Sequence, residues 1–517
     1  MTGYPPPLPD GQRAWATLAL SLAAFMQVLD NTIANVAIPT IAGSLGASTT
    51  QGTWVITSFG VANAIAVPIS GWLARRVGEV RLFLWATVGF VITSWLCGVA
   101  PSLEALIFFR VLQGALAGPV IPLSQSLLLA AYPNEKKGMA LALWSMLVIV
   151  APICGPILGG WISDNWHWSW LFFINVPIGL ASLAIAWRVM QGRETHVSKL
   201  PVDRIGLILL VVGVGSLQLV LGRGRELDWF ASAEIVVLAV VAVVALSYLI
   251  VWEWYDDHPV VDLALFKERN FTVGVVATGI GFLLYLGAEV LIPLLLQTQL
   301  NYTATQAGLA VAPVGILPVL LSPIIGRYVY RLDLRWVVTM SFLAFAMCFA
   351  WRASSFVPGM DFAAVVWPQF VLGLAVAGFF MPLTTMAFAG LRPEQIAGAS
   401  ALSNFLRTLA GSIGASLVSA LWERREALHH ARLTESVSLF DPGTLVALDG
   451  LVQQGLTSQE ANGLIVREIT RQAYFIGANE IFWGSAILFL LLTGLVWFAR
   501  PPFRPAGGGS APADAAH

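Results

Sequence analysis

Two stretches of this sequence are near-copies of each other: VLQGALAGPVIPL at residues 111–123 and VLGLAVAGFFMPL at residues 371–383. Seven of the thirteen positions carry the identical residue, among them Gly118 and Pro122. Both stretches are apolar almost throughout. Self-similarity of this kind indicates a chain that is built from two related halves.

The composition places these halves in a membrane. Of the 517 residues, 57% are hydrophobic and only 11% are charged, whereas soluble domains carry about 25% charged residues. The net charge of −1 excludes the basic field that a nucleic-acid partner requires. Cys97, Cys154 and Cys348 lie far apart inside apolar runs, so we expect neither a disulfide framework nor a metal cluster.

Apolar runs long enough to cross a bilayer, about 20 residues each, recur along the whole chain. Proline and glycine inside them are compatible with membrane helices, since neighbouring helices satisfy the freed backbone groups. The runs predict an all-α membrane protein with fourteen spans, near residues 14–38, 52–73, 81–100, 104–130, 138–161, 168–190, 204–222, 232–254, 271–296, 304–326, 334–353, 361–390, 397–421 and 479–499.

The two copies fall in the fourth and twelfth spans. A separation of eight spans predicts two six-helix halves with two additional helices between them, and parallel repeats place a transport site where the halves meet. The expected divisions are a tail at 1–13, the first half at 14–190, the additional helices at 191–270, the second half at 271–499 and a tail at 500–517.

Lysine and arginine predict the orientation, because they concentrate in short cytoplasmic loops. With both termini in the cytoplasm, eighteen basic residues lie inside, and the short outer loops hold only Arg223, Arg225 and Arg352. The long polar segment 422–478 then lies outside. We expect it to be one external segment that can form short amphipathic helices.

Four charged residues lie within predicted spans: Asp30, Arg110, Glu289 and Arg407. A charge at the bilayer centre costs about 2.5–3.5 kcal/mol, so each is a candidate for function. At about 1.5 Å per residue, Asp30, Arg110 and Glu289 share one depth, about 12–13 Å from the outer surface. We therefore expect both acids to face one central cavity.

The roles of these residues have alternatives. Asp30 is either a proton-coupling group or only a structural partner of Arg110. Glu289 either couples protons or shapes the cavity, and Arg110 is expected to set the proton affinity of an acid rather than to bind substrate. Polar stripes at helical spacing predict the substrate cavity. Its expected lining is Gln27, Asn31, Asn35, Gln113, Tyr285 and Arg407.

Four motifs in order resemble the major facilitator superfamily, in particular its fourteen-span drug:proton antiporters. They are LDNTIANVAIP at 29–39, RVLQG at 110–114, GPILGG at 155–160 and WSWLFFINVP at 168–177. The third is similar to the antiporter motif of the family, with Gly155, Pro156, Gly159 and Gly160 as its matching residues.

The resemblance implies a secondary transporter, not an enzyme, which exports hydrophobic drugs across the bacterial inner membrane in exchange for protons. It implies no cofactor or metal. It also implies two protein partners, a periplasmic adaptor of the membrane fusion type and a TolC-type outer-membrane channel. An uptake carrier of the same fold is the nearest rival, but it would need more convergent polar groups than these spans offer.

The loop between the second and third spans departs from the family pattern. The family usually has an acid where this chain has Arg75 and a base where it has Glu79. Two alternatives fit this departure: a charge-swapped salt bridge, or a solvated loop that only follows the positive-inside rule.

Overall fold

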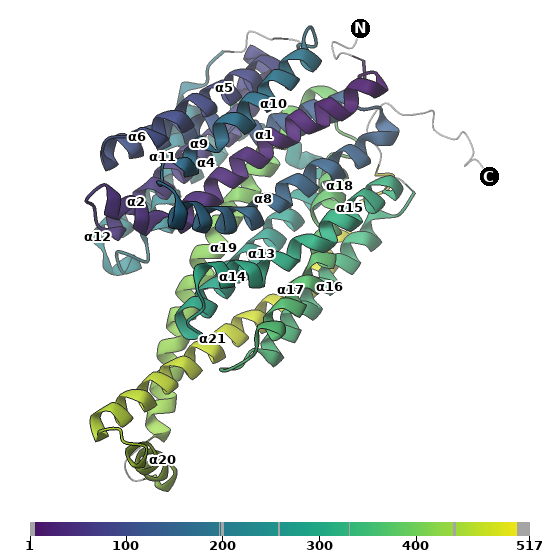
Figure 1. Ribbon diagram of the computed structural model, residues 1–517. Helices are drawn as coiled ribbons and strands as arrows, with labels where there is room; N and C mark the ends of the chain where they lie inside the picture. The colour runs from purple at the N-terminus through teal and green to yellow at the C-terminus, as the bar shows by residue number, and fades with distance from the viewer. Residues whose placement is uncertain are drawn as a thin grey trace, which may run out of the picture.

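The computed structural model describes residues 6–195, 197, 201–256, 259–329, 331–437 and 441–503. Within these ranges every regular element is a helix. Fourteen helical segments are long and apolar enough to cross a membrane, which confirms the fourteen predicted spans. They form an elongated bundle (Figure 1).

The first six spans contain helices that break near glycine and proline, as in the fourth span between Ala117 and Val120. Their bounds are α1 Asp10–Val36, α4 Trp54–Val77, α5 Glu79–Gly98, α6 Leu103–Ala117 with α7 Val120–Ala131, α8 Lys137–Asn165, and α9 Trp170–Phe173 with α10 Asn175–Met190. Two short helices, α2 Ile38–Ser44 and α3 Thr49–Gly52, follow the first span.

The two additional spans are α11 Arg204–Arg223 and α12 Ala233–Tyr255. The last six spans are α13 Arg269–Gln299, α14 Ala304–Val311 with α15 Ile316–Tyr328, α16 Leu334–Ser355, α17 Phe362–Ala377 with α18 Phe380–Ala387, α19 Pro393–Ser436 and α21 Ser458–Val496. Short 3₁₀ turns are η1 Asn134–Lys136, η2 Trp229–Ala231, η3 Leu263–Lys267 and η4 Ala312–Gly315, and α20 is Pro442–Gln453.

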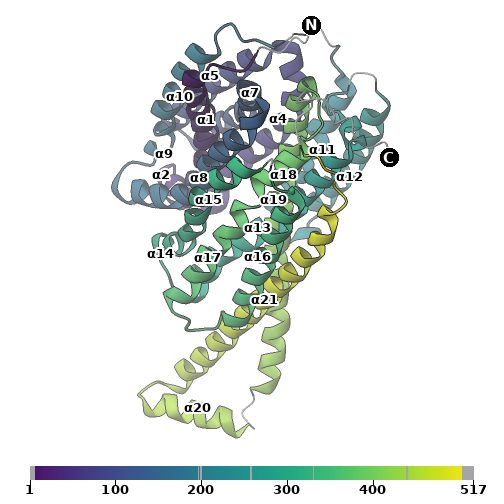
Figure 2. The ribbon, with the colours of Figure 1, turned by 90° about the vertical axis from the view of Figure 1, so that its right-hand side faces the viewer.

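Helices α19 and α21 are much longer than a bilayer is thick. They have 44 and 39 residues, whereas about 20 suffice to cross the hydrocarbon. Their extensions project from the bundle and, with α20, form a helical hairpin over the described residues 422–437 and 441–478 (Figure 2). Of the short amphipathic helices expected in this segment, α20 is a short helix of its own, whereas most of the segment continues the two spans.

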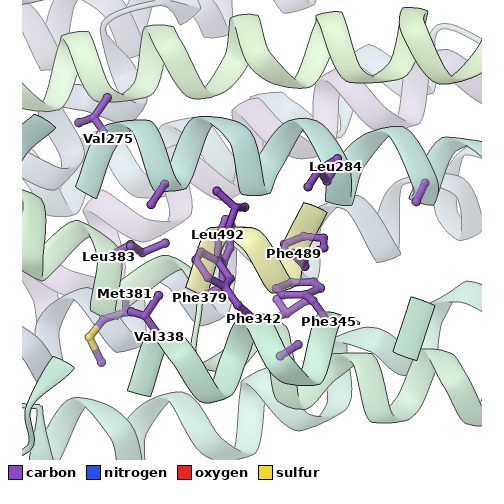
Figure 3. Close-up of a cluster of buried hydrophobic side chains, with 14 of the residues drawn as sticks. Val275, Leu284, Val338, Phe342, Phe345, Phe379, Met381, Leu383, Phe489 and Leu492 are labelled. Atoms are coloured by element: carbon purple, nitrogen blue, oxygen red, sulfur yellow. The ribbon is translucent and has the colours of Figure 1, made fainter. Parts of the chain in front are cut away.

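The bundle thus has two distinct ends. The terminal end is where α1 begins and α21 finishes, and the hairpin end is opposite (Figure 1). The second half has an aromatic core in which Phe345 stacks on Phe489 with ring centroids 4.6 Å apart (Figure 3). Phe342 and Phe379 are also fully buried in this core. Close packing of this kind lets the half move as a rigid unit.

The two halves meet in close backbone contact toward the terminal end. A Cβ atom at Gly71 of α4 would lie 2.9 Å from the Cα of Gly398 in α19, and one at Gly326 of α15 would lie 2.6 Å from the Cβ of Ala142 in α8. Buried hydrogen bonds reinforce the contact. Gln125 Oε1 accepts from Ser400 Oγ at 2.7 Å and from Asn404 Nδ2 at 2.7 Å. We call Gln125, Ser400 and Asn404 the polar latch.

Candidate transport and proton-coupling site

Asp30 and Arg110 form an ion pair inside the first half. Arg110 Nη1 lies 2.6 Å from Asp30 Oδ2, and both side chains have an exposed fraction of 0%. The pair joins α1 to α6. Burial makes the pair costly to break, because separation would leave an uncompensated charge in a medium of low polarity.

Further hydrogen bonds fix this pair from two sides. Asp30 Oδ1 accepts from Gln113 Nε2 at 3.1 Å and from Asn175 Nδ2 at 2.6 Å. Arg110 donates to Gln113 Oε1 at 2.8 Å and to the Val55 carbonyl at 3.0 Å. Gln113 was predicted to line the substrate cavity, but it is fully buried in this network. Asn175 was not predicted as a site residue, although the family motif that contains it was a signal.

The second half contains a matching triad. Arg352 Nη1 lies 3.0 Å from Glu289 Oε1, and Gln369 bridges the two by accepting from Arg352 at 2.7 Å and donating to Glu289 at 3.0 Å. Each half therefore pairs an acid on its first helix with an arginine and a glutamine.

Two features of these ion pairs differ from the predictions. Arg352 was assigned to a short outer loop, but it lies near the end of α16 with an exposed fraction of 0%. The positive-inside rule counts arginines at span ends and takes no account of a buried carboxylate that binds one. The two acids also do not face one central cavity in this structure, since each acid is paired within its own half and Asp30 is fully buried.

The other predicted cavity residues lie in different surroundings. Gln27 is buried, and its Oε1 has no hydrogen-bond partner among the described residues. Asn31 and Asn35 are exposed on α1. Tyr285 packs against Phe282 and Phe345, with centroids 6.3 Å and 5.7 Å away. Arg407 lies beside two phenylalanine rings rather than beside an acid.

The glycines of the GPILGG motif let α8 approach α1. A Cβ atom at Gly155 would lie 2.1 Å from Thr32 Oγ1, and one at Gly159 would lie 2.9 Å from the Ile33 carbonyl oxygen. At Gly160 the nearest atom would be Thr305 Oγ1 at 3.8 Å, an ordinary contact. The side chain of Pro156 lies outside the described residues. Gly155 and Gly159 therefore hold α8 against the helix that carries Asp30.

We expect Gly155→Ala to reduce transport at least tenfold, because the added methyl group pushes α8 from α1 and disturbs the Asp30 pair. Gly160→Ala is the matched control, since that position has room for a methyl group. Drug efflux from cells with equal amounts of each variant in the membrane is the measurement. Equal activity of the two variants would show that this close packing is not required.

The loop between the second and third spans, where the charges differ from the family pattern, is partly buried. Glu79 has an exposed fraction of 3% and accepts a hydrogen bond from Ser126 Oγ at 2.5 Å. Arg75 donates to the Pro259 carbonyl at 3.4 Å, in the segment that follows the additional helix α12. The solvated-loop alternative is therefore wrong for Glu79, and Arg75 joins the first half to the additional helices.

Comparison with known proteins agrees with these observations. The sequence profile of the Major Facilitator Superfamily matches residues 20–415. The chain belongs to the major facilitator superfamily. The fold of this superfamily is also found in the human organic anion transporter MFSD10, with a TM-score of 0.56 at 13% identity, over 94% of this chain and 100% of that one.

Within the superfamily, the chain is similar to bacterial export proteins over nearly its whole length. It is 62% identical to the multidrug export protein EmrB of Escherichia coli strain K12, over 97% of this chain and 98% of the relative. It is 57% identical to the fatty acid resistance protein FarB of Neisseria gonorrhoeae, over 98% of this chain and 99% of the relative. The chain is thus a multi-pass membrane transporter of this superfamily.

Proposed function

We infer that this protein is a proton-driven multidrug antiporter of the bacterial inner membrane, which exports hydrophobic and amphipathic compounds. The observation that carries this proposal is the Asp30–Arg110 pair, which is fully buried on the first helix of a half. A buried ionisable pair inside a membrane protein is a typical element of a proton pathway. The 62% identity to a multidrug export protein supports drugs as the cargo.

The coupling follows from exchange of partners at Asp30. While α1, α6 and α10 are packed as seen here, the carboxylate is satisfied by Arg110, Gln113 and Asn175. A movement of α1 that separates Asp30 from these donors would leave a carboxylate without compensation, and binding a proton removes its charge. Return to the packed arrangement releases that proton. Drug and proton then move in opposite directions because drug binding favours the deprotonated carboxylate, so the halves reorient with either drug or proton bound.

The contacts between the two halves are the part of the structure that must change during transport. The polar latch and the glycine contacts close the bundle toward the terminal end. Opening there requires the latch residues to part and the two halves to rotate as units. The rigid aromatic core of the second half fits such a rocking movement.

The test of this function is transport by inside-out membrane vesicles. A proton gradient with an acidic lumen should drive accumulation of a drug such as ethidium in vesicles that contain the protein, and a protonophore should abolish it. Accumulation that does not depend on the gradient would refute antiport. Gradient-driven loss of drug from the lumen would favour the rival uptake carrier.

We also infer that the terminal end faces the cytoplasm and that the hairpin lies in the periplasm, since basic residues dominate the loops of the terminal end. In a variant without Cys97, Cys154 and Cys348, cysteines at the exposed positions Glu435 and Asn462 should react with an impermeant thiol reagent in intact spheroplasts. A cysteine at Glu135, exposed at the terminal end, should react only after lysis. The reverse pattern would invert the topology.

The hairpin is the proposed attachment point for a periplasmic adaptor and, through it, a TolC-type channel. It projects beyond the bundle and exposes apolar side chains, among them Leu445 and Val446. Its base is held by an ion pair of Glu480 with Arg425 at 3.2 Å, and His429 Nε2 lies 3.1 Å from the same carboxylate. A cut beyond these residues therefore leaves the spans supported.

Replacing residues 431–470 with a short glycine–serine linker should leave vesicle transport within about twofold of wild type, because the base of the hairpin is intact. Drug resistance of whole cells should be lost, since exported drug would no longer reach the outer-membrane channel. Growth inhibition by drug is measured beside vesicle transport. Resistance that survives the replacement would rule out the hairpin as the attachment point.

A further inference from the structure

Arg407 is a cation deep in the bundle that has no acid beside it. It lies on α19, fourteen residues after Pro393, and thus about 21 Å along the helix from the terminal end. In the described part of the chain, no hydrogen-bond or ion-pair partner is found for its guanidinium group. The other two deep arginines, Arg110 and Arg352, each bind a carboxylate.

This difference leaves Arg407 without an opposite charge beside it. Asp30 neutralises Arg110 and Glu289 neutralises Arg352, so Arg407 adds one uncompensated positive charge. A charge at such depth costs about 2.5–3.5 kcal/mol, a cost that a structural role alone does not explain. The side chain is also partly accessible, whereas Arg110 and Arg352 are fully buried. Its N–H donors are therefore available to a ligand.

The surroundings of Arg407 are aromatic. Its guanidinium carbon lies 5.7 Å from the ring centroid of Phe282 on α13 and 6.0 Å from that of Phe380 on α18. The two rings pack edge to face with centroids 5.7 Å apart, and both are partly accessible. Cation–π contacts are worth about 0.5–2 kcal/mol and leave the guanidinium donors unused. An anionic group bound here would have an apolar surface directly beside it.

Arg407 lies at a position in the fold where a transported ligand would bind. Asn404 of the polar latch precedes Arg407 by one helical turn, on the side of the terminal end. Arg407 thus lies next to the contact between the halves, which must open during transport. It lies too deep along α19 to reach a lipid headgroup at the membrane surface.

We propose that Arg407 binds the carboxylate of an amphipathic organic anion, whose apolar part lies on Phe282 and Phe380. This inference rests on the proposed efflux function, and it names one class of substrate that the transporter would export. Arginine suits the role, because its planar fork matches a carboxylate with two parallel hydrogen bonds. Binding of the anion also neutralises the uncompensated charge next to the latch.

The experiment compares three ligands that share one naphthyl ring: naphthaleneacetate, naphthylethanol and naphthylethylammonium. Equilibrium dialysis with the purified full-length protein gives their affinities. For the wild type we expect the acetate to bind about 10- to 100-fold more tightly than the alcohol, the range for hydrogen bonds to a charged group. Arg407→Gln should lose this advantage and bind the alcohol as before. Arg407→Lys should keep part of it, since it retains charge but not the fork.

Phe282→Ala is the second variant, expected to weaken all three ligands alike because it removes only apolar surface. Equal affinities of the wild type for the acetate and the alcohol would overturn the proposal. An Arg407→Gln variant that keeps the preference for the acetate, or that loses affinity for all three ligands equally, would also overturn it. Gradient-driven ethidium efflux is measured in parallel. If it persists while the acetate preference is absent, this inference fails and the proposed transport function stands.

Discussion

Asp30→Asn is expected to abolish proton-driven efflux and to lower the stability of the folded protein. Asparagine keeps the size of the side chain and some of its hydrogen bonds, but it does not titrate. It also leaves Arg110 charged and fully buried without a carboxylate. Removing one member of a buried pair costs about 3–5 kcal/mol. We therefore expect drug binding to persist at reduced thermal stability, while transport in vesicles falls to background.

The double variant Asp30→Asn/Arg110→Gln separates these two effects. It removes both charges and so should recover most of the stability, because no uncompensated charge remains. Efflux should stay at background, since the titrating group is still absent. Thermal unfolding in detergent and vesicle transport are compared for the three proteins. Recovery of transport in the double variant would show that Asp30 serves only to satisfy Arg110.

Arg352→Met is expected to have the second largest effect. Arg352 is fully buried and binds both Glu289 and Gln369. Methionine fills similar space but leaves Glu289, with an exposed side-chain fraction of only 9%, without its cation. We expect a loss of about 3 kcal/mol in stability, and efflux at least tenfold below wild type because the second half is no longer packed as seen here.

Arg335→Met is the matched control on the same helix. Arg335 also binds an acid, Asp333, at 2.6 Å, but the two side chains have exposed fractions of 23% and 31%. Exposed ion pairs contribute about 0–1 kcal/mol to stability, so this variant should lose little stability and little transport activity. Thermal unfolding and vesicle transport report on both variants. Similar losses in the two would mean that the burial of Arg352 is not what matters.

Much of the fold could be predicted because a bilayer imposes a simple rule. Every spanning helix needs an apolar run of fixed length, so composition alone located all fourteen spans. The hairpin could not be predicted in the same way. Beyond the bilayer, α19 and α21 continue with residues such as Glu426 and Glu468, whose polarity is equally compatible with a loop.

The candidate site was predictable mainly where a charge lay in the middle of a span. Asp30, Arg110 and Glu289 met that condition, and the depth estimate placed Asp30 and Arg110 together. Arg352 did not, because an arginine at a span end is ordinary unless a buried acid binds it. Asn175 carries no charge, and only the helix packing brings it within 2.6 Å of Asp30.

We propose that Asp30 exchanges its proton when drug binds. Drug-induced proton release from the purified protein, followed with a pH-sensitive dye in weakly buffered detergent solution, tests it directly. We predict release by the wild type on addition of drug, and none by Asp30→Asn/Arg110→Gln at drug concentrations that saturate both proteins. Undiminished release by the double variant would rule out Asp30 as the exchanging group and place the proton elsewhere, with Glu289 as the next candidate.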